Sequence, residues 1–338
     1  MFIPAQASHR RTNKNVLSLI SIQSCHTLII ENRNPLRNCF VTGTVLTLAV
    51  YMLTLTRNTP QNPLPFTIPS CNFAPFKGKR FMVQPLYFIS DLHFHVDPTP
   101  QDAEKLRRFR ALSRRIIADE GVLYIVGDLY DFWFEYKYAI PRHHLGVLWI
   151  ISELAEAGTE IHYLTGNHDY WIGEFWEKDM GVHIHQAPIE TSYADKRFWI
   201  CHGDGVLADD RGYRILKKIL RNPVAIRLFR LLHPDWAFRL AKKVSSTSRK
   251  YNKFDIDQNR QLLTRVYEEY VLDVFQQGYD YVVMGHLHHP HLHTNENQTF
   301  INLGDWLNFY TFGVFDGAEF TLNYLTENLE RRIRRKSW

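Results

Sequence analysis

Five short polar segments, each directly after a run of apolar residues, carry side chains that could bind metal ions. Carboxylate, amide and imidazole groups are ligands for Mn, Fe, Zn or Mg, and the absence of thiolates from these segments excludes a structural zinc site. Two such ions could clamp a phosphoryl group and generate a nucleophile from water, so no Ser or Cys nucleophile is required. The segments are Asp91-Leu92-His93, Gly127-Asp128-Leu129-Tyr130-Asp131, Gly166-Asn167-His168-Asp169, His202-Gly203-Asp204 and Gly285-His286-Leu287-His288.

The apolar runs that precede these segments are predicted to be buried β-strands, over residues 86–89, 122–126, 161–164, 198–201 and 281–284. In an α/β sheet the carboxyl ends of the strands meet at one edge, where ligands bind. Each segment alone is also typical of an ordinary polar turn. The recurrence of five of them, all at strand ends, favours one shared metal site, and their glycines allow tight turns beside it.

The order and residue types of the five segments resemble the calcineurin-like metallophosphoesterase family over about residues 82–325. The resemblance implies an α/β fold, a four-layer α/β/β/α sandwich with the metals at the carboxyl edges of both sheets. It also implies a helical insertion at about residues 206–256. The implied ligands are Asp91, His93 and His288 for the first ion, Asn167, His202 and His286 for the second, and Asp128 as the bridge.

Within this family the chain resembles the bacterial UDP-2,3-diacylglucosamine diphosphatases, which cleave their substrate to a lipid monophosphate and UMP in lipid A synthesis. The motifs that carry this resemblance lie at residues 127–133, 202–210 and 248–252. The resemblance implies a substrate-binding set of Asn167, His168, Asp210, Ser248 and Asn252. One departure is His168, because those enzymes usually have arginine at that position.

His168 and Asp169 are the candidate catalytic pair. Cleavage of a pyrophosphate expels an oxygen whose developing charge can be met by a cation or by a general acid. We expect Asp169 to orient the His168 imidazole so that it supplies one of these. The alternative is that His168 only hydrogen-bonds a loop carbonyl.

The insertion between the fourth and fifth segments is strongly basic. Residues 211–253 contain thirteen Lys or Arg and one acid, Asp235, among apolar residues at helical spacing. Asn222-Pro223 and His233-Pro234 interrupt the pattern, which predicts about three short amphipathic helices. Such helices could lie on anionic lipid and hold acyl chains. Nucleic acid as a partner, or a solvated helical cap with an ordinary packed face, are the alternatives.

The composition of the 338 residues, 45% hydrophobic and 14% aromatic, is typical of a globular protein. The net charge of +5 is uneven, because residues 1–81 carry nine Lys or Arg and only Glu31 as an acid. The remaining residues are therefore mildly acidic with one basic insertion, which makes a nucleic-acid partner unlikely. Cys201 is the one cysteine beyond residue 81, so no disulfide framework forms there and a reducing compartment is expected.

Residues 1–81 are predicted to be a disordered leader or an upstream extension of the gene model, because they are rich in Asn, Thr and Pro and show no clean periodicity. A membrane anchor is the alternative, since residues 38–56 are uncharged and long enough to span a bilayer. The basic tail over residues 326–338 is expected to be solvated or membrane-facing.

The sequence thus predicts a hydrolase that uses two divalent ions, with Mn preferred, at the cytoplasmic face of a bacterial inner membrane. Its expected substrate is a nucleotide-sugar lipid such as UDP-2,3-diacylglucosamine, and no protein partner is inferred. One alternative is a metallophosphoesterase for soluble nucleotides or nucleic acid. Another is a catalytically silent protein-binding scaffold, although the complete ligand set argues against silence.

Overall fold

The structure, a computed structural model, describes residues 83–207, 217–218, 221–240, 242, 256–326 and 331–332. The predictions for the leader, for its stretch 38–56 and for the substrate contacts Asp210, Ser248 and Asn252 lie outside these residues. Two arginines of the predicted basic tail lie inside them, where they form the short strand β12 (Arg331–Arg332).

A seven-stranded sheet has the strand order β12-β11-β10-β1-β2-β3-β4. Strands β1 to β4 run parallel, and β10 joins β1 on the other side as an antiparallel neighbour. The strand β1 pairs with β2 from Leu86 opposite Val122 to Ile89 opposite Ile125. The bounds are β1 Leu86–Ile89, β2 Val122–Val126, β3 Ile161–Leu164, β4 His183–His185, β10 Thr311–Phe315 and β11 Phe320–Tyr324.

A five-stranded sheet has the order β5-β6-β7-β9-β8. Its three central strands β6, β7 and β9 are parallel, and the two outer strands are antiparallel to their neighbours. The bounds are β5 Ile189–Tyr193, β6 Lys196–Cys201, β7 Tyr281–Met284, β8 His291–Asn295 and β9 Gln298–Asn302. All five predicted strands are confirmed. Strands β1, β2, β3 and β7 have the predicted bounds, and β6 begins two residues earlier than predicted.

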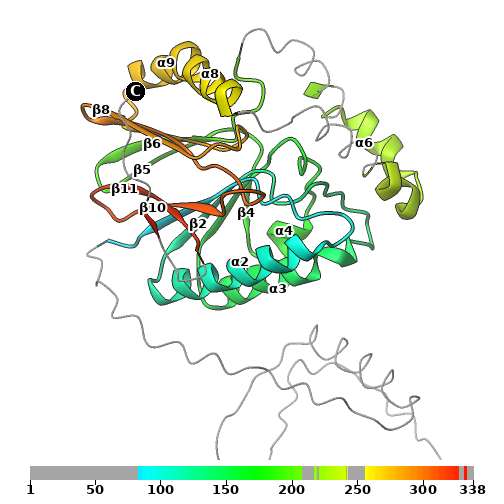
Figure 1. The fold of residues 1–338 in the computed structure, drawn as a ribbon. Helices are drawn as coiled ribbons and strands as arrows, with labels where there is room; N and C mark the ends of the chain where they lie inside the picture. The colour runs from blue at the N-terminus through cyan, green and yellow to red at the C-terminus, as the bar shows by residue number, and fades with distance from the viewer. Residues whose placement is uncertain are drawn as a thin grey trace, which may run out of the picture. The chain divides into compact units, whose positions relative to one another are not determined.

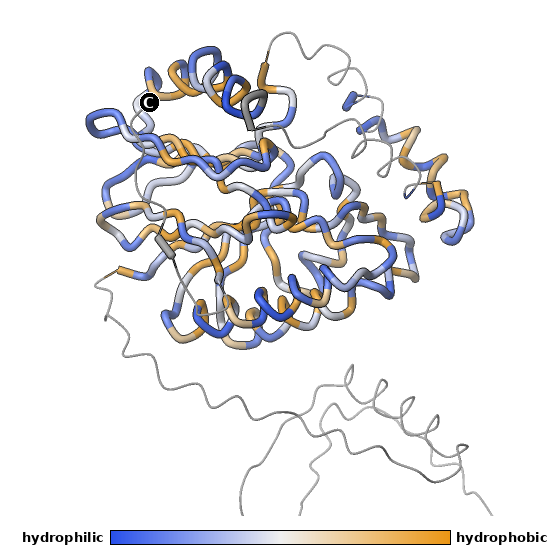
Figure 2. The backbone as a smooth tube through the Cα atoms, viewed as in Figure 1, coloured by the Kyte–Doolittle hydropathy of each residue, from blue (hydrophilic) through white to orange (hydrophobic). Residues whose placement is uncertain are grey.

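Three buried apolar clusters separate four layers of secondary structure. Side chains alternate along β1, so Tyr87 and Ile89 pack against the first helices while Leu86 and Phe88 pack against the second sheet. The third cluster joins the outer face of the second sheet to the last helices. Figure 1 shows α2 and α3 on one outer face and α8 and α9 on the other, and Figure 2 shows apolar residues concentrated along the strands. The expected four-layer α/β/β/α sandwich is confirmed.

The helix α2 starts where the sequence supplies a cap. The helix α2 begins after Thr99, which forms a capping box with Asp102, and Pro100 occupies its first turn. A π-helical turn over Tyr267–Val271 joins α8 to α9. The bounds are α2 Pro100–Ala118, α3 Leu145–Glu156, α4 Phe175–Lys178, α8 Ile256–Val266 and α9 Leu272–Gln276.

The insertion forms short helices separated where the prolines predict. The helix α6 (Pro223–Arg230) begins at Pro223 with Asn222 as its N-cap, and a second helix covers residues 234–240. We call residues 217–242 of this insertion the cap. Among the described residues, no helix combines the length and the apolar character needed to cross a bilayer.

A chain that begins at Met82 should fold and keep the thermal unfolding midpoint of the full chain. Strand β1 starts at Leu86, and its two neighbours β2 and β10 both lie after residue 82, so the truncation removes no strand of either sheet. Circular dichroism during heating measures this. An insoluble truncated chain, or one whose midpoint falls by more than a few degrees, would show that residues 1–81 stabilise the folded protein.

Candidate metal centre

The carboxyl ends of the parallel strands from both sheets meet at one edge and are hydrogen-bonded to each other. The backbone nitrogen of His286, after β7, donates to Oδ2 of Asp91, after β1, at 2.8 Å. His202 Nδ1, after β6, lies 2.9 Å from the carbonyl oxygen of Val126 at the end of β2. The two sheets are therefore joined through the polar segments themselves, which fixes these segments relative to one another.

Five of the candidate ligands have left-handed backbone conformations, which are uncommon for residues other than glycine. Their φ angles lie between 47° and 67°. Such strain is retained only where the surrounding structure compensates for it, and it is concentrated at functional sites. The five residues are Asp91, His93, Asp128, His286 and His288.

Two glycines are required because other candidate ligands lie against them. A Cβ at Gly127, where φ is +83°, would lie 2.3 Å from His202 Nδ1. A Cβ at Gly166 would lie 2.1 Å from Asp128 Oδ1, which is far inside contact distance. Both positions must therefore be glycine for the ligand side chains to approach this closely.

The first group of candidate ligands is Asp91, His93 and His288. Asp91 Oδ1 lies 3.6 Å from His93 Nε2 and 3.5 Å from His288 Nε2. Oδ2 of Asp91 accepts hydrogen bonds from Ser90 and from the backbone of His286. By contrast, neither Asp91 Oδ1 nor His93 Nε2 has a hydrogen-bond partner among the described residues, although both are buried.

The second group is Asp128, His202 and His286, with Asn167 Oδ1 at 3.1 Å from His202 Nε2. Oδ2 of Asp128 lies 3.4 Å from His202 Nε2 and 3.7 Å from His93 Nε2. One carboxylate oxygen thus faces a histidine from each group. The structure brings all seven predicted metal ligands together in this one cluster.

Three of the histidines, His93, His202 and His288, are held by their Nδ1 atoms, which turns Nε2 toward the centre of each group. His93 Nδ1 lies 3.3 Å from Asp131, and His288 Nδ1 lies 3.2 Å from Asp305. A carboxylate or carbonyl on the far nitrogen is the usual support of a metal-binding histidine. Together with the buried atoms that lack hydrogen-bond partners, this arrangement fits a pair of divalent cations.

The buried carboxylates and imidazoles shift each other's pKa values strongly. Burial alone would raise the pKa of Asp91, but His288 and His93 outweigh it and lower the pKa to about 2. Burial alone would lower the pKa of His93, but Asp131, Asp91 and Asp128 raise it to about 10. The pKa of His202 is raised by Asp128 despite burial. Without a metal, protons on these histidines therefore balance the carboxylates.

Two supporting residues were given no role in the prediction. Asp131 lies in the second polar segment and holds His93, and Asp305 holds His288. The sequence signal for Asp305 is Gly304-Asp305, a polar pair that follows β9 as the other segments follow their strands. A third such residue, the buried Lys105 of α2, donates to the carbonyl oxygen of His93 at 2.7 Å, but in sequence it is only one of several charged residues of this helix.

The expected orientation of His168 by Asp169 is wrong. Asp169 is fully buried and accepts hydrogen bonds from the backbone nitrogens of Leu129 at 2.7 Å and Gly166 at 2.8 Å, and from the Tyr163 hydroxyl. It therefore positions the second and third polar segments. His168 Nδ1 instead lies 3.0 Å from the carbonyl oxygen of Asp131, and its ring stands edge-on to His93. His168 still lies at the cluster, beside Asp128.

The fourth segment connects the centre to the cap. Asp204 forms ion pairs with Lys217 and, at 3.9 Å, with Arg221. Both cations belong to the basic insertion predicted from sequence, so part of its charge is paired with the edge that carries the candidate metal ligands. The remaining predicted substrate contacts, Asp210, Ser248 and Asn252, are outside the described residues.

Metal binding should release protons, because a cation must displace them from His93 and His202. The pKa of His93, about 10 without metal, means that this proton is bound at neutral pH. Metal affinity should therefore rise with pH up to about pH 10, by ~10-fold per pH unit for each proton released. His286, whose pKa burial lowers to about 4, should release none.

Calorimetric titration of the metal-free protein with Mn, in two buffers of different ionisation enthalpy at pH 7.5, counts the released protons. Asp131→Asn is the matched control, because it removes a carboxylate that raises the pKa of His93 and should reduce the count. Identical heats in both buffers would contradict the charge balance described for the centre.

The chain is similar in sequence to several known proteins. The sequence profile of the calcineurin-like phosphoesterase family matches residues 84–290. The chain is 30% identical over 262 residues to a UDP-2,3-diacylglucosamine hydrolase of Porphyromonas gingivalis, covering 72% of this chain and 98% of that protein. It is 31% identical over 232 residues to the protein of that name from Neisseria meningitidis serogroup B, covering 68% and 92%.

A solved structure of an archaeal phosphodiesterase is also similar, with 16% identity and a TM-score of 0.37 over 71% of this chain and 98% of that chain. The match of the family profile to more than half of the chain agrees with the five polar segments and the sandwich fold. The chain is therefore a hydrolase that belongs to the calcineurin-like phosphoesterase family.

Proposed function

We propose that this protein uses two divalent metal ions, with Mn preferred, to hydrolyse the pyrophosphate of UDP-2,3-diacylglucosamine, giving the lipid monophosphate and UMP. The observation that carries the two-ion proposal is the position of Asp128 Oδ2 between His93 of one group and His202 of the other. A pair of ions about 3.5–4 Å apart needs such a bridging carboxylate. The first ion would be held by Asp91, His93, His288 and Asp128, and the second by Asn167, His202, His286 and Asp128.

The ions, when bound, supply positive charge to the phosphoryl oxygens and activate water at neutral pH. The protein's own residues orient these groups. Asp131 and Asp305 hold the imidazoles of His93 and His288, and Asp169 holds the loops that carry Asp128 and Asn167. His168, beside Asp128, is suited to meet the charge that develops on the departing phosphate oxygen.

An aromatic cluster between the cap and the core supports the proposal that the substrate is acylated. Phe229 of α6 packs against Trp171 and Phe134, with ring centroids 4.7 and 4.8 Å apart. Phe132, directly after Asp131, contacts Phe229 and the cap residue Phe238. Trp171 follows Asp169 by two residues, so this apolar cluster adjoins the polar segments of the metal centre. An acyl chain that extends from a sugar at the ions would meet apolar side chains here.

The cap also supports association with a membrane surface. Its helices expose basic residues beside large apolar side chains, among them Leu228 and Leu231. Anionic lipid attracts such a surface and accommodates its apolar residues. We infer from this surface that the protein acts as a peripheral protein at the cytoplasmic face of the inner membrane. Asp210, Ser248 and Asn252 of the same insertion remain proposed contacts of the nucleotide-sugar head group.

The substrate is tested by comparing UDP-2,3-diacylglucosamine in detergent micelles with a soluble UDP-sugar, both with Mn. The wild-type protein should prefer the diacylated substrate. Phe229→Asn should lower kcat/KM for that substrate by ~10- to 100-fold, because burial of a large apolar side chain is worth about 1.5–3 kcal/mol. Its effect on the soluble UDP-sugar should be small.

Leu272→Asn is the matched control, since Leu272 belongs to α9, outside the cap, and is 37% exposed. It should affect the micellar substrate much less than Phe229→Asn does. If the wild-type protein prefers soluble nucleotides and Phe229→Asn changes no activity, the lipid assignment is wrong and the substrate is a soluble nucleotide.

A further inference from the structure

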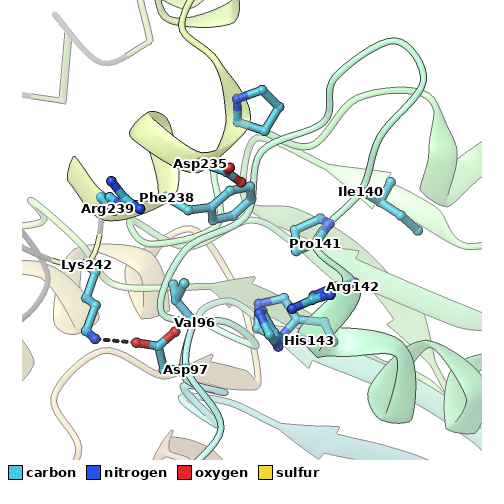
Figure 3. A pocket seen from close by; sticks show the side chains of 12 residues that line it. Val96, Asp97, Ile140, Pro141, Arg142, His143, Asp235, Phe238, Arg239 and Lys242 are labelled. Atoms are coloured by element: carbon cyan, nitrogen blue, oxygen red, sulfur yellow. Dashed lines mark hydrogen bonds and ion pairs between the residues drawn. The ribbon is translucent and has the colours of Figure 1, made fainter.

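A cavity of about 510 Å³ lies between the cap and the core, lined by none of the seven candidate metal ligands. The cap contributes Pro234, Asp235, Phe238, Arg239 and Lys242, and the core contributes residues 96–97 and 140–144. Figure 3 shows Arg239 and Lys242 on one side of the cavity and Arg142 and His143 on the other. The cavity therefore has basic side chains on each of two separate elements.

The charges in this cavity are only partly compensated. Lys242 forms an ion pair with Asp97, which joins the cap to the core. Asp235 lies 3.8 Å from His233 on the cap itself. Among the described residues, neither Arg142 nor Arg239 forms an ion pair, so two guanidinium groups remain for a ligand. Guanidinium groups bind phosphate oxygens through paired, charge-assisted hydrogen bonds.

The surroundings of the cavity favour an amphiphilic ligand. Val96, Ile140 and Phe238 form apolar parts of its wall. The elements that form the wall continue into exposed apolar side chains, with Trp149 on α3 67% exposed and Trp236 on the cap 66% exposed. Tryptophan is favoured at the boundary between lipid headgroups and acyl chains. A free anion would use the arginines but would gain nothing from these exposed rings.

We propose that this cavity binds the phosphate headgroup of an anionic membrane lipid, with Arg142 of the core and Arg239 of the cap on either side of it. The lipid would be a second ligand beside the substrate at the metal centre, and its cavity shares Phe238 with the aromatic cluster proposed for the acyl chain. Because its two arginines come from different elements, an occupied cavity holds the cap against the core at the membrane surface. This inference needs no hydrolytic activity, so it can fail or hold independently of the proposed reaction.

Co-sedimentation of the full chain with vesicles tests the proposal. Vesicles of phosphatidylcholine that contain phosphatidic acid should bind the wild-type protein, and vesicles of phosphatidylcholine alone should bind it at least tenfold more weakly. Arg142→Gln with Arg239→Gln should weaken binding to the phosphatidic acid vesicles by about tenfold or more. An unchanged circular dichroism spectrum and unfolding midpoint show that the variant is folded.

The matched control is Arg227→Gln with Arg230→Gln, which removes the same two charges from α6 outside the cavity. This control variant should lose clearly less binding to the phosphatidic acid vesicles, because its arginines contribute only general electrostatic attraction to the vesicle surface. Equal losses in the two variants, or no loss in the cavity variant, would overturn the proposed site. Soluble glycerol 3-phosphate is a further arm: if it binds with the affinity of the vesicles, the site takes free phosphate esters and the lipid assignment is wrong.

Discussion

The burial of several carboxylates and imidazoles at one edge of two sheets is the constraint on which the rest of the structure depends. Asp91 and Asp128 are fully buried within a few ångströms of four histidine rings. Removing such groups from water is costly unless opposite charge compensates them. The raised pKa values of His93 and His202 show how protons supply that charge without metal, and two cations would supply it more fully. The strained turns, the joined sheets and the glycines all serve to hold this cluster.

The strands and the clustering of the candidate metal ligands could be predicted because both have strong local signals. A buried parallel strand is a short continuous apolar run, and the residue after it leaves the sheet at a fixed edge. The run at residues 122–126 followed by Gly127-Asp128 is the clearest case, and the structure places β2 at those residues. The helix boundaries in the insertion also had local signals, since α6 starts at Pro223 after its N-cap residue Asn222.

The supporting contacts could not be predicted in the same way, because each depends on which strands become neighbours. Asp169 was expected to orient the adjacent His168, yet its carboxylate accepts from Gly166 of its own turn and from Leu129, which lies beside it only once β2 and β3 are paired. Lys105 reaches His93 from a helix of the outer layer. Sequence separation of ten to forty residues hides such pairs from pattern analysis, whereas Asp305 carried a signal in its position after β9.

The proposed function depends on Asp128 bridging two metal ions that the seven candidate ligands would hold. Anomalous X-ray diffraction from crystals of the Mn-loaded protein tests this bridge. We expect two anomalous peaks ~3.5–4 Å apart, one among Asp91, His93 and His288 and the other among Asn167, His202 and His286, with the Asp128 carboxylate between them. A single peak, or two peaks that do not share Asp128, would contradict it.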